Sequence, residues 1–118
     1  DRRLSGLIDF YFACNDFLAY DLAVALNSWC FDAGGSYLRG HAQALFEGYS
    51  RVREPRREEI AAMPVLARGA GLRFVLTRLQ DWNEQPSLAR PASKDPLEYW
   101  ARVEFHQSIG DAAGYGLA

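Results

Sequence analysis

The sequence predicts a mainly α-helical domain with a short β element at its N-terminus. Two observations favour helices. Apolar residues recur every three or four positions over much of the chain, and Asp95-Pro96-Leu97-Glu98 has the residue types that begin a helix. The β element is predicted because the apolar run 4–10 is short and is interrupted by Gly6. A chain of 118 residues, 49% of them hydrophobic, can bury one core. We therefore expect a single domain over residues 1–118.

The first two predicted elements are the strand at 4–10 and the helix that follows it. Asp9 lies at the carboxyl end of the strand. Asn15 and Asp16 can accept hydrogen bonds from the first free N–H groups of the helix. One face of this helix would carry Leu18, Leu22, Ala25, Leu26 and Trp29. The helix should end at Gly34-Gly35, because glycine can adopt a left-handed turn.

Two further helices are predicted in the middle of the chain. Ser36 can cap the first of them, which runs to about Val52 and would carry on its inner face Leu38, Ala42, Leu45, Phe46 and Tyr49. Pro64 predicts a break or kink in the next helix, because proline removes one backbone hydrogen bond. From 65 to 82 the sequence is apolar on nearly every side, which is typical of a helix at the centre of a domain.

Glycine and proline mark the remaining features of the second half. Gly69 and Gly71 destabilise a helix, so we expect them where another part of the chain approaches closely. Prolines and polar residues predict a loop over 84–93. Asp95 should begin the last helix, and the Gly/Ala-rich tail from Gly110 is expected to fray.

Composition excludes several classes of partner. A formal net charge of -2 and a pI near 5.6 provide no positive field for nucleic acid. No apolar run reaches the ~20 residues of a membrane-spanning helix, and no signal-peptide core follows the first residues. Cys14 and Cys30 lie among apolar residues and are expected to be buried thiols. These features predict a cytoplasmic protein that binds neither membrane nor nucleic acid.

Asp9 is the residue that most suggests chemistry. An acidic residue where a strand ends is the geometry by which many phosphotransferases hold Mg²⁺ against nucleotide phosphates. Many aspartates at strand ends only cap a turn, so that interpretation stays open. His41 and His106 are lone helical histidines, for which surface or structural roles are expected. The sequence contains no glycine-rich phosphate loop and no zinc-ligand cluster.

Most of the chain resembles a known family of kinases. Its start resembles the strand, metal-binding Asp-Phe and following helix of the aminoglycoside and choline kinase-like superfamily, in Gly6-Leu7-Ile8-Asp9-Phe10 through Asp16 and in Tyr20-Asp21-Leu22-Ala23. Within that superfamily it is most similar to the homoserine kinases, in Asn27-Ser28-Trp29-Cys30-Phe31, Leu66-Ala67-Arg68-Gly69-Ala70, Leu72-Arg73-Phe74, Thr77-Arg78-Leu79, Asp81-Trp82 and Lys94-Asp95-Pro96-Leu97-Glu98-Tyr99. The resemblance covers residues 4 to about 106.

This resemblance implies the helical C-terminal lobe of an ATP-dependent kinase that phosphorylates L-homoserine in threonine biosynthesis. It implies that Asp9 binds Mg²⁺ that bridges the ATP phosphates and that Asp21 braces the catalytic loop. Tyr11 stands where protein kinases have the glycine of Asp-Phe-Gly, so flipping of that motif is not implied. We expect the N-terminal lobe that covers ATP, and a His-x-Asp-x-x-x-x-Asn catalytic loop, to precede Asp1. The fragment alone should therefore be inactive.

The central helix carries candidates for binding the substrate carboxylate. Homoserine has a carboxylate, which an arginine can bind through two hydrogen bonds. Arg68 lies on an apolar stripe, which suggests burial, and Arg73 lies on a more polar strip. The alternative for any one arginine of this helix is an internal ion pair, such as Arg78 or Arg73 with Asp81. An acidic pocket would favour another acceptor, such as an aminoglycoside, choline or a thiosugar. A buried, paired Asp9 would favour a non-catalytic helical binding module.

Overall fold

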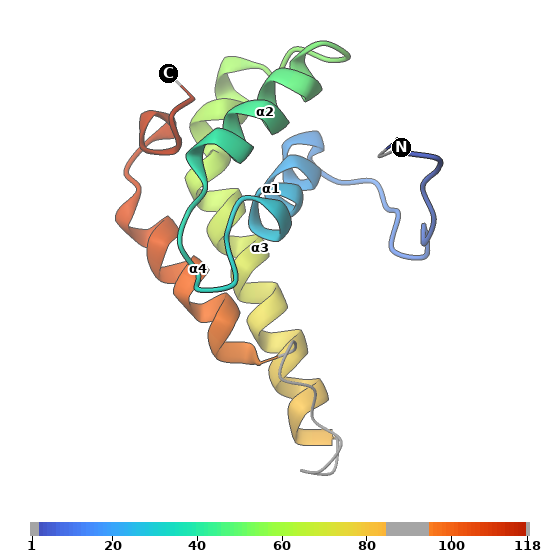
Figure 1. Ribbon diagram of the computed structural model, residues 1–118, viewed down its shortest axis with the longest axis vertical. Coiled ribbons are helices and arrows are strands. Elements are labelled where there is room, and N and C mark those ends of the chain that lie inside the picture. The colour runs from blue at the N-terminus through green and yellow to red at the C-terminus, as the bar shows by residue number, and fades with distance from the viewer. Residues whose placement is uncertain (1–2, 85–94, 118) are drawn as a thin grey trace.

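The computed structural model describes residues 3–84 and 95–117, and within these ranges the chain is mainly helical. The elements are α1 (Leu18–Trp29), α2 (Arg39–Ser50), α3 (Arg57–Glu84), α4 (Pro96–Ser108) and the 3₁₀ helix η3 (Ala112–Tyr115). α3 runs the length of the molecule, and both α1 and α4 pack against it (Figure 1). The predicted fold class, a helical lobe, is confirmed. Apart from Glu84, which ends α3, the predicted loop at 84–93 lies outside the described residues.

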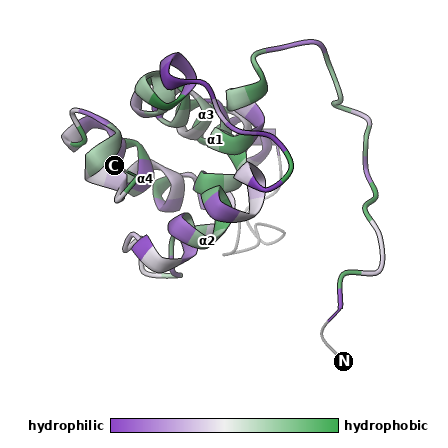
Figure 2. Cartoon of the chain, turned by 90° about the horizontal axis from the view of Figure 1, so that it is seen from above, coloured by the Kyte–Doolittle hydropathy of each residue, from purple (hydrophilic) through white to green (hydrophobic). Residues whose placement is uncertain are grey.

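The predicted β element at 4–10 does not form. Residues 3–17 contain neither helix nor strand, and Ile8 and Tyr11 are each 91% exposed. In Figure 2 this segment runs outside the group of helices. A strand needs a neighbouring strand to pair its backbone N–H and C=O groups, and the described part of the chain places none beside it. Cys14 is exposed for the same reason, whereas Cys30 is buried as predicted.

α1 is bounded differently from the prediction. It begins at Leu18 after Phe17, and Asp16 Oδ1 accepts a hydrogen bond from the Phe17 N–H at 2.7 Å instead of capping the helix. Its buried residues are Ala19, Leu22, Ala23, Leu26 and Asn27. The face is therefore rotated from the predicted one, and Trp29 is 70% exposed.

The glycine pair serves a turn rather than the end of α1. Phe31 and Tyr37 form an isolated antiparallel bridge. Between them, Asp32 Oδ1 accepts hydrogen bonds from the N–H groups of Gly34 at 2.9 Å and Ser36 at 2.8 Å. Gly35 has φ +83°, the left-handed conformation in which glycine is favoured. Because this turn consumes the segment, α2 begins only at Arg39, without the predicted Ser36 cap.

α2 and α3 confirm the apolar pattern but not the predicted break. Ala42 and Phe46 are buried on the inner face of α2 as expected. α3 continues through Pro64 as one helix of 28 residues. Its buried face consists of Met63, Ala67, Ala70, Gly71 and Val75. Packing of this face offsets the hydrogen bond that Pro64 cannot donate, which is why tertiary structure overrides the local signal.

Gly71 marks the point where three helices meet. A Cβ atom on Gly71 would lie 3.1 Å from Val103 Cγ2 and 3.2 Å from Asn27 Oδ1, so α4 and α1 both approach α3 here. The predicted close approach is confirmed for Gly71. At Gly69 a Cβ would meet nothing within 4 Å, so the prediction is wrong for that residue.

The last helix and the tail form an ordered end to the domain. Asp95 accepts a hydrogen bond from the Leu97 N–H at 2.8 Å and Pro96 opens α4, which confirms the predicted start. The tail does not fray. Asp111 Oδ1 accepts from the Ala113 and Gly114 N–H groups, and Tyr115 is fully buried. A large aromatic side chain that fills the core holds the segment in place.

Candidate functional site

Asp9 lies on the extended N-terminal segment and is free of partners. Its side chain is exposed and has no hydrogen bond or ion pair within residues 3–84 and 95–117. Its φ of +70° makes it the one non-glycine residue with positive φ in the described part of the chain. A turn follows, in which the Ala13 N–H donates to the Phe10 carbonyl at 3.0 Å. The carboxylate is thus presented to solvent at a bend of the backbone.

Asp21 lies in the first turn of α1, on its exposed side. A carboxylate at this position interacts favourably with the positive end of the helix dipole. No hydrogen bond joins Asp21 to another described residue, so the bracing partner implied by the resemblance is not among residues 3–84 and 95–117.

Arg68 and Arg73 are both exposed on α3. The burial suggested for Arg68 is therefore wrong. Neither arginine forms an ion pair with a residue in the described ranges. The Arg73 guanidinium lies 4.6 Å from the centre of the Phe74 ring. Both cations are thus available to an anionic group from outside the described chain.

Two other arginines form ion pairs with Glu98 at the start of α4. Arg78 Nη1 contacts Glu98 Oε2 at 3.0 Å and donates to the Asp95 carbonyl at 3.2 Å. Its partner is therefore Glu98 and not the expected Asp81. Arg102, which is 5% exposed, donates to Glu98 Oε1 at 2.6 Å and also to the Asn27 carbonyl. These contacts hold the start of α4 against α3 and α1.

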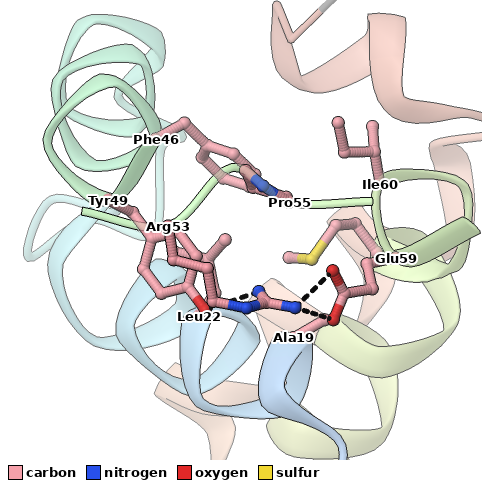
Figure 3. Close-up of a pocket in the computed structure, with 9 residues that line it drawn as sticks. Ala19, Leu22, Phe46, Tyr49, Arg53, Pro55, Glu59 and Ile60 are labelled. Carbon is pink, nitrogen blue, oxygen red and sulfur yellow. Dashed lines mark hydrogen bonds and ion pairs between the residues drawn. The ribbon is translucent and has the colours of Figure 1, made fainter. Parts of the chain in front are cut away.

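Two hollows among the described residues do not coincide with the predicted site residues. The hollow in Figure 3 lies where α1, α2 and α3 meet and is filled by the chain itself. Arg53 Nη2 pairs with both Glu59 oxygens at 2.6 and 2.8 Å, and Arg53 Nη1 donates to Tyr49 Oη at 2.8 Å. This contact raises the pKa of Arg53, and the Arg56 N–H together with Arg53 lowers the pKa of Glu59. It is a structural contact.

An open groove of about 590 Å³ lies between the turn at 33–35 and the start of α4. Asp95 and Glu98 line it together with Ala33, Gly34, Gly35, Leu97 and Ala101. Asp95 is occupied as the helix cap and Glu98 by two arginines. Its polar groups are therefore already satisfied by the fold.

A buried polar network centred on His106 was not foreseen from the sequence. Asn27 Nδ2 donates to the carbonyls of Ala23 and Ala67, so Asn27 Oδ1 is left to accept from His106 Nε2 at 3.1 Å. The other ring nitrogen, His106 Nδ1, then accepts from Tyr115 Oη at 2.9 Å. This assignment requires a neutral imidazole. Burial, and then the nearby Arg102 cation, lower the pKa of His106 to about 4. A lone helical histidine gives no sequence signal for such a network.

The described residues hold a partial site. No group of three or more His, Cys, Asp or Glu side chains that could enclose a metal occurs in residues 3–84 and 95–117. Among the predicted site residues, the chain presents the exposed carboxylate of Asp9, the carboxylate of Asp21 at the start of α1, and the exposed guanidinium groups of Arg68 and Arg73 on α3. Such groups can bind a cation and an anion once further residues complete their surroundings.

Comparison with known proteins agrees with the resemblance seen in the sequence. Residues 1–55 match the phosphotransferase enzyme family. Over 115 residues, 98% of the chain, it is 58% identical to a homoserine kinase of Sinorhizobium fredii and 59% identical to one of Rhizobium meliloti. It is 57% identical over its full length to a homoserine kinase of Xanthobacter autotrophicus. The chain spans 35% to 37% of the length of these relatives. It is therefore a relative of the homoserine kinases, matching about a third of such an enzyme, and its first 55 residues have the sequence features of the phosphotransferase enzyme family.

Proposed function

We propose that residues 1–118 form the C-terminal, substrate-binding lobe of a homoserine kinase. This enzyme transfers the γ-phosphoryl group of ATP to the hydroxyl of L-homoserine, a step of threonine biosynthesis. The observation that carries the proposal is identity of 58% over 98% of the chain to an enzyme named homoserine kinase. Because the chain spans about a third of such relatives, the lobe that covers ATP and the catalytic base come from the rest of the polypeptide.

Asp9 is the proposed metal ligand. Proteins commonly bind Mg²⁺ through one or two carboxylates together with substrate phosphates, so a single exposed carboxylate without a protein partner fits this role. A left-handed backbone is costly for a residue other than glycine and is often retained at functional positions. When bound, Mg²⁺ neutralises charge on the ATP phosphates. The exposure of Asp9 also removes the condition that would have favoured a non-catalytic binding module.

Asp21 and the arginines of α3 have positioning and binding roles in this proposal. Asp21, exposed at the start of α1, would accept hydrogen bonds from the catalytic loop and hold it in place. Either Arg68 or Arg73 would bind the homoserine carboxylate through two parallel hydrogen bonds. Binding the carboxylate fixes the position of the hydroxyl that accepts the phosphoryl group.

The proposed enzyme works in the cytoplasm on small molecules. Its partners are ATP, L-homoserine, Mg²⁺ and the N-terminal lobe of the same polypeptide. The net charge of -2 supports the absence of a nucleic-acid partner. The proposal includes no membrane partner.

A chimeric enzyme tests the function and the role of Asp9 together. The preceding two thirds of the Rhizobium meliloti homoserine kinase, joined to residues 1–118, should phosphorylate homoserine, whereas residues 1–118 alone should not. Asp9→Asn keeps the size of the side chain but removes its charge, so kcat should fall by about 10² to 10³. Glu47→Gln, which changes an exposed carboxylate on α2, is the matched control and should leave kcat unchanged.

Two results would contradict the proposal. Turnover by residues 1–118 alone, above that of a heat-treated sample, would rule out a lobe that lacks its catalytic base. A wild-type kcat in Asp9→Asn at saturating Mg²⁺ would eliminate the metal role of Asp9.

A further inference from the structure

One face of α3 is apolar and exposed along about four helical turns. We call this face the outer stripe, and it consists of Val65, Gly69, Leu72, Leu76 and Leu79. The successive spacings of four, three, four and three residues are those of a helix that packs lengthwise on another helix. The apolar side chains of the stripe are 63%, 42%, 58% and 44% exposed in chain order. Monomeric proteins seldom leave such a contiguous row uncovered.

The outer stripe lies opposite the face that α3 buries in the core. Met63, Ala67, Ala70 and Gly71 are all buried toward α1 and α4. At 100° per residue these positions and the outer stripe project from opposite sides of the helix. Val75, at one edge of the stripe, is buried with Tyr99 and Val103 of α4. α4 therefore covers that margin, and the rest of the stripe is left for a further element.

Gly69 opens the stripe to a close neighbour. Nothing lies within 4 Å of the place that a Cβ atom would occupy at this residue. A glycine in the middle of a helix destabilises it relative to alanine. Inside the described domain no neighbour requires the absence of a side chain at Gly69. The glycine instead allows an element from outside to approach the helix closely.

The charges beside the outer stripe disfavour a second copy of the chain. Arg68 flanks it on one side and Arg73 on the other, and neither forms an ion pair with a described residue. In a parallel pairing of two stripes, Arg68 of one copy lies opposite Arg73 of the other. In an antiparallel pairing with Leu72 opposite Leu76, residue 73 lies opposite residue 75, so the two Arg73 side chains are only about two residues apart along the axis. Like charges at these positions destabilise paired helices.

The same arginines disfavour a lipid occupant. By length and composition alone, α3 could span a membrane. Yet Arg68 and Arg73 lie near its middle, where charged side chains are costly in hydrocarbon, and α1 and α4 already cover one side. A helix with carboxylates beside its apolar residues complements the outer stripe better than either alternative.

We propose that the outer stripe is the docking surface for an amphipathic helix from the remaining part of the full-length kinase. The inference rests on the proposed function only in requiring that longer polypeptide, since the homoserine kinases similar to this chain are almost three times its length. The docked helix separates Arg68 from Arg73. One of them therefore faces the substrate pocket, and the other pairs with a carboxylate of the docked helix.

Thiol labelling of the full-length kinase tests this surface. Leu76→Cys is made with Cys14→Ser, because Cys14 is exposed and Cys30 is buried. Cys30 is kept in this variant. In the native full-length protein, a maleimide should react with the thiol introduced by Leu76→Cys at least about tenfold more slowly than it does in urea. Val52→Cys, at a residue that is 91% exposed, is the control and should react at nearly its urea rate. Leu79→Cys provides a second variant should Leu76→Cys not fold.

Three outcomes would overturn the proposal. In the first, both stripe variants are labelled at the urea rate. In the second, a dimer protects the stripe, and the protection is lost when dilution dissociates that dimer. In the third, protection requires phosphatidylglycerol vesicles. Kinase activity is measured on the same samples. An active enzyme with an unprotected stripe would refute the docking surface and leave the proposed function intact.

Discussion

Arginines in this domain divide according to whether they have a partner. Arg53, Arg78 and Arg102 each contact a carboxylate at 3.0 Å or less, and Arg102 is almost fully buried. Removing a partner from a buried pair leaves an uncompensated charge, which destabilises strongly. Arg68 and Arg73 have no such partner in the described ranges. Substituting either of them can therefore change substrate binding with little change in the stability of the fold.

Substitution of these two exposed arginines tests substrate binding in the full-length enzyme. If Arg73 holds the homoserine carboxylate, Arg73→Met should raise the KM for homoserine by about 10²-fold or more, because a charge-assisted pair of hydrogen bonds is lost. The KM for ATP and the melting temperature should change little. The same comparison applies to Arg68→Met. Unchanged homoserine KM values in both variants would show that groups outside α3 hold the carboxylate.

At the scale of the helix, the two glycines of α3 have opposite environments. Gly71→Ala places a Cβ 3.1 Å from Val103 and 3.2 Å from Asn27, so it should lower the free energy of unfolding of residues 1–118 by roughly 1 to 3 kcal/mol. Gly69→Ala meets nothing within 4 Å and should raise it by roughly 0.5 to 1 kcal/mol. Urea denaturation of the two variants provides the measurement. Equal effects of the same sign would mean that the helices do not meet at Gly71.

The helices show which features local sequence can predict and which it cannot. The apolar spacing of α2 and the Asp95-Pro96 start of α4 are properties of a few neighbouring residues, and both were predicted correctly. The break predicted at Pro64 is wrong because the packing of α3 outweighs one lost hydrogen bond. The strand at 4–10 needs a pairing partner from elsewhere, and the burial of Tyr115 depends on residues such as Tyr37, which lies 78 positions away.

The candidate site is less predictable than the fold for a similar reason. Asp9, Asp21, Arg68 and Arg73 were predicted from sequence and resemblance, yet the described part of the lobe does not gather them around either of the two hollows described above. A site assembled from several segments is fixed by tertiary contacts, which local patterns do not encode. The position of each residue on an exposed surface is consistent with a site that other parts of the enzyme complete.

For the whole molecule, the His106 network predicts how stability depends on pH. Folding holds the pKa of His106 at about 4, below its ordinary value of 6.5, so the unfolded chain binds more protons between these values. The stabilisation is complete above about pH 6.5 and is lost as pH falls toward 4, by roughly 3 kcal/mol in total. Urea titrations from pH 7 to 4.5 measure the slope. His106→Gln should flatten it, whereas the exposed His41→Gln should not; equal slopes in all three proteins would refute the assignment.

The same network also governs when the chain can finish folding during synthesis. Asn27 is made early, but its carboxamide oxygen is bonded by His106, which lies 79 positions later, and His106 is in turn bonded by Tyr115. Until α4 and η3 have left the ribosome, the Asn27 carboxamide oxygen therefore lacks its partner, although α2 and α3 can already cover the apolar face of α1. Contacts between such distant positions form late, because the ends of a long loop must first be brought together. The buried polar contacts of α1 must therefore wait for the last segment of the lobe to be made.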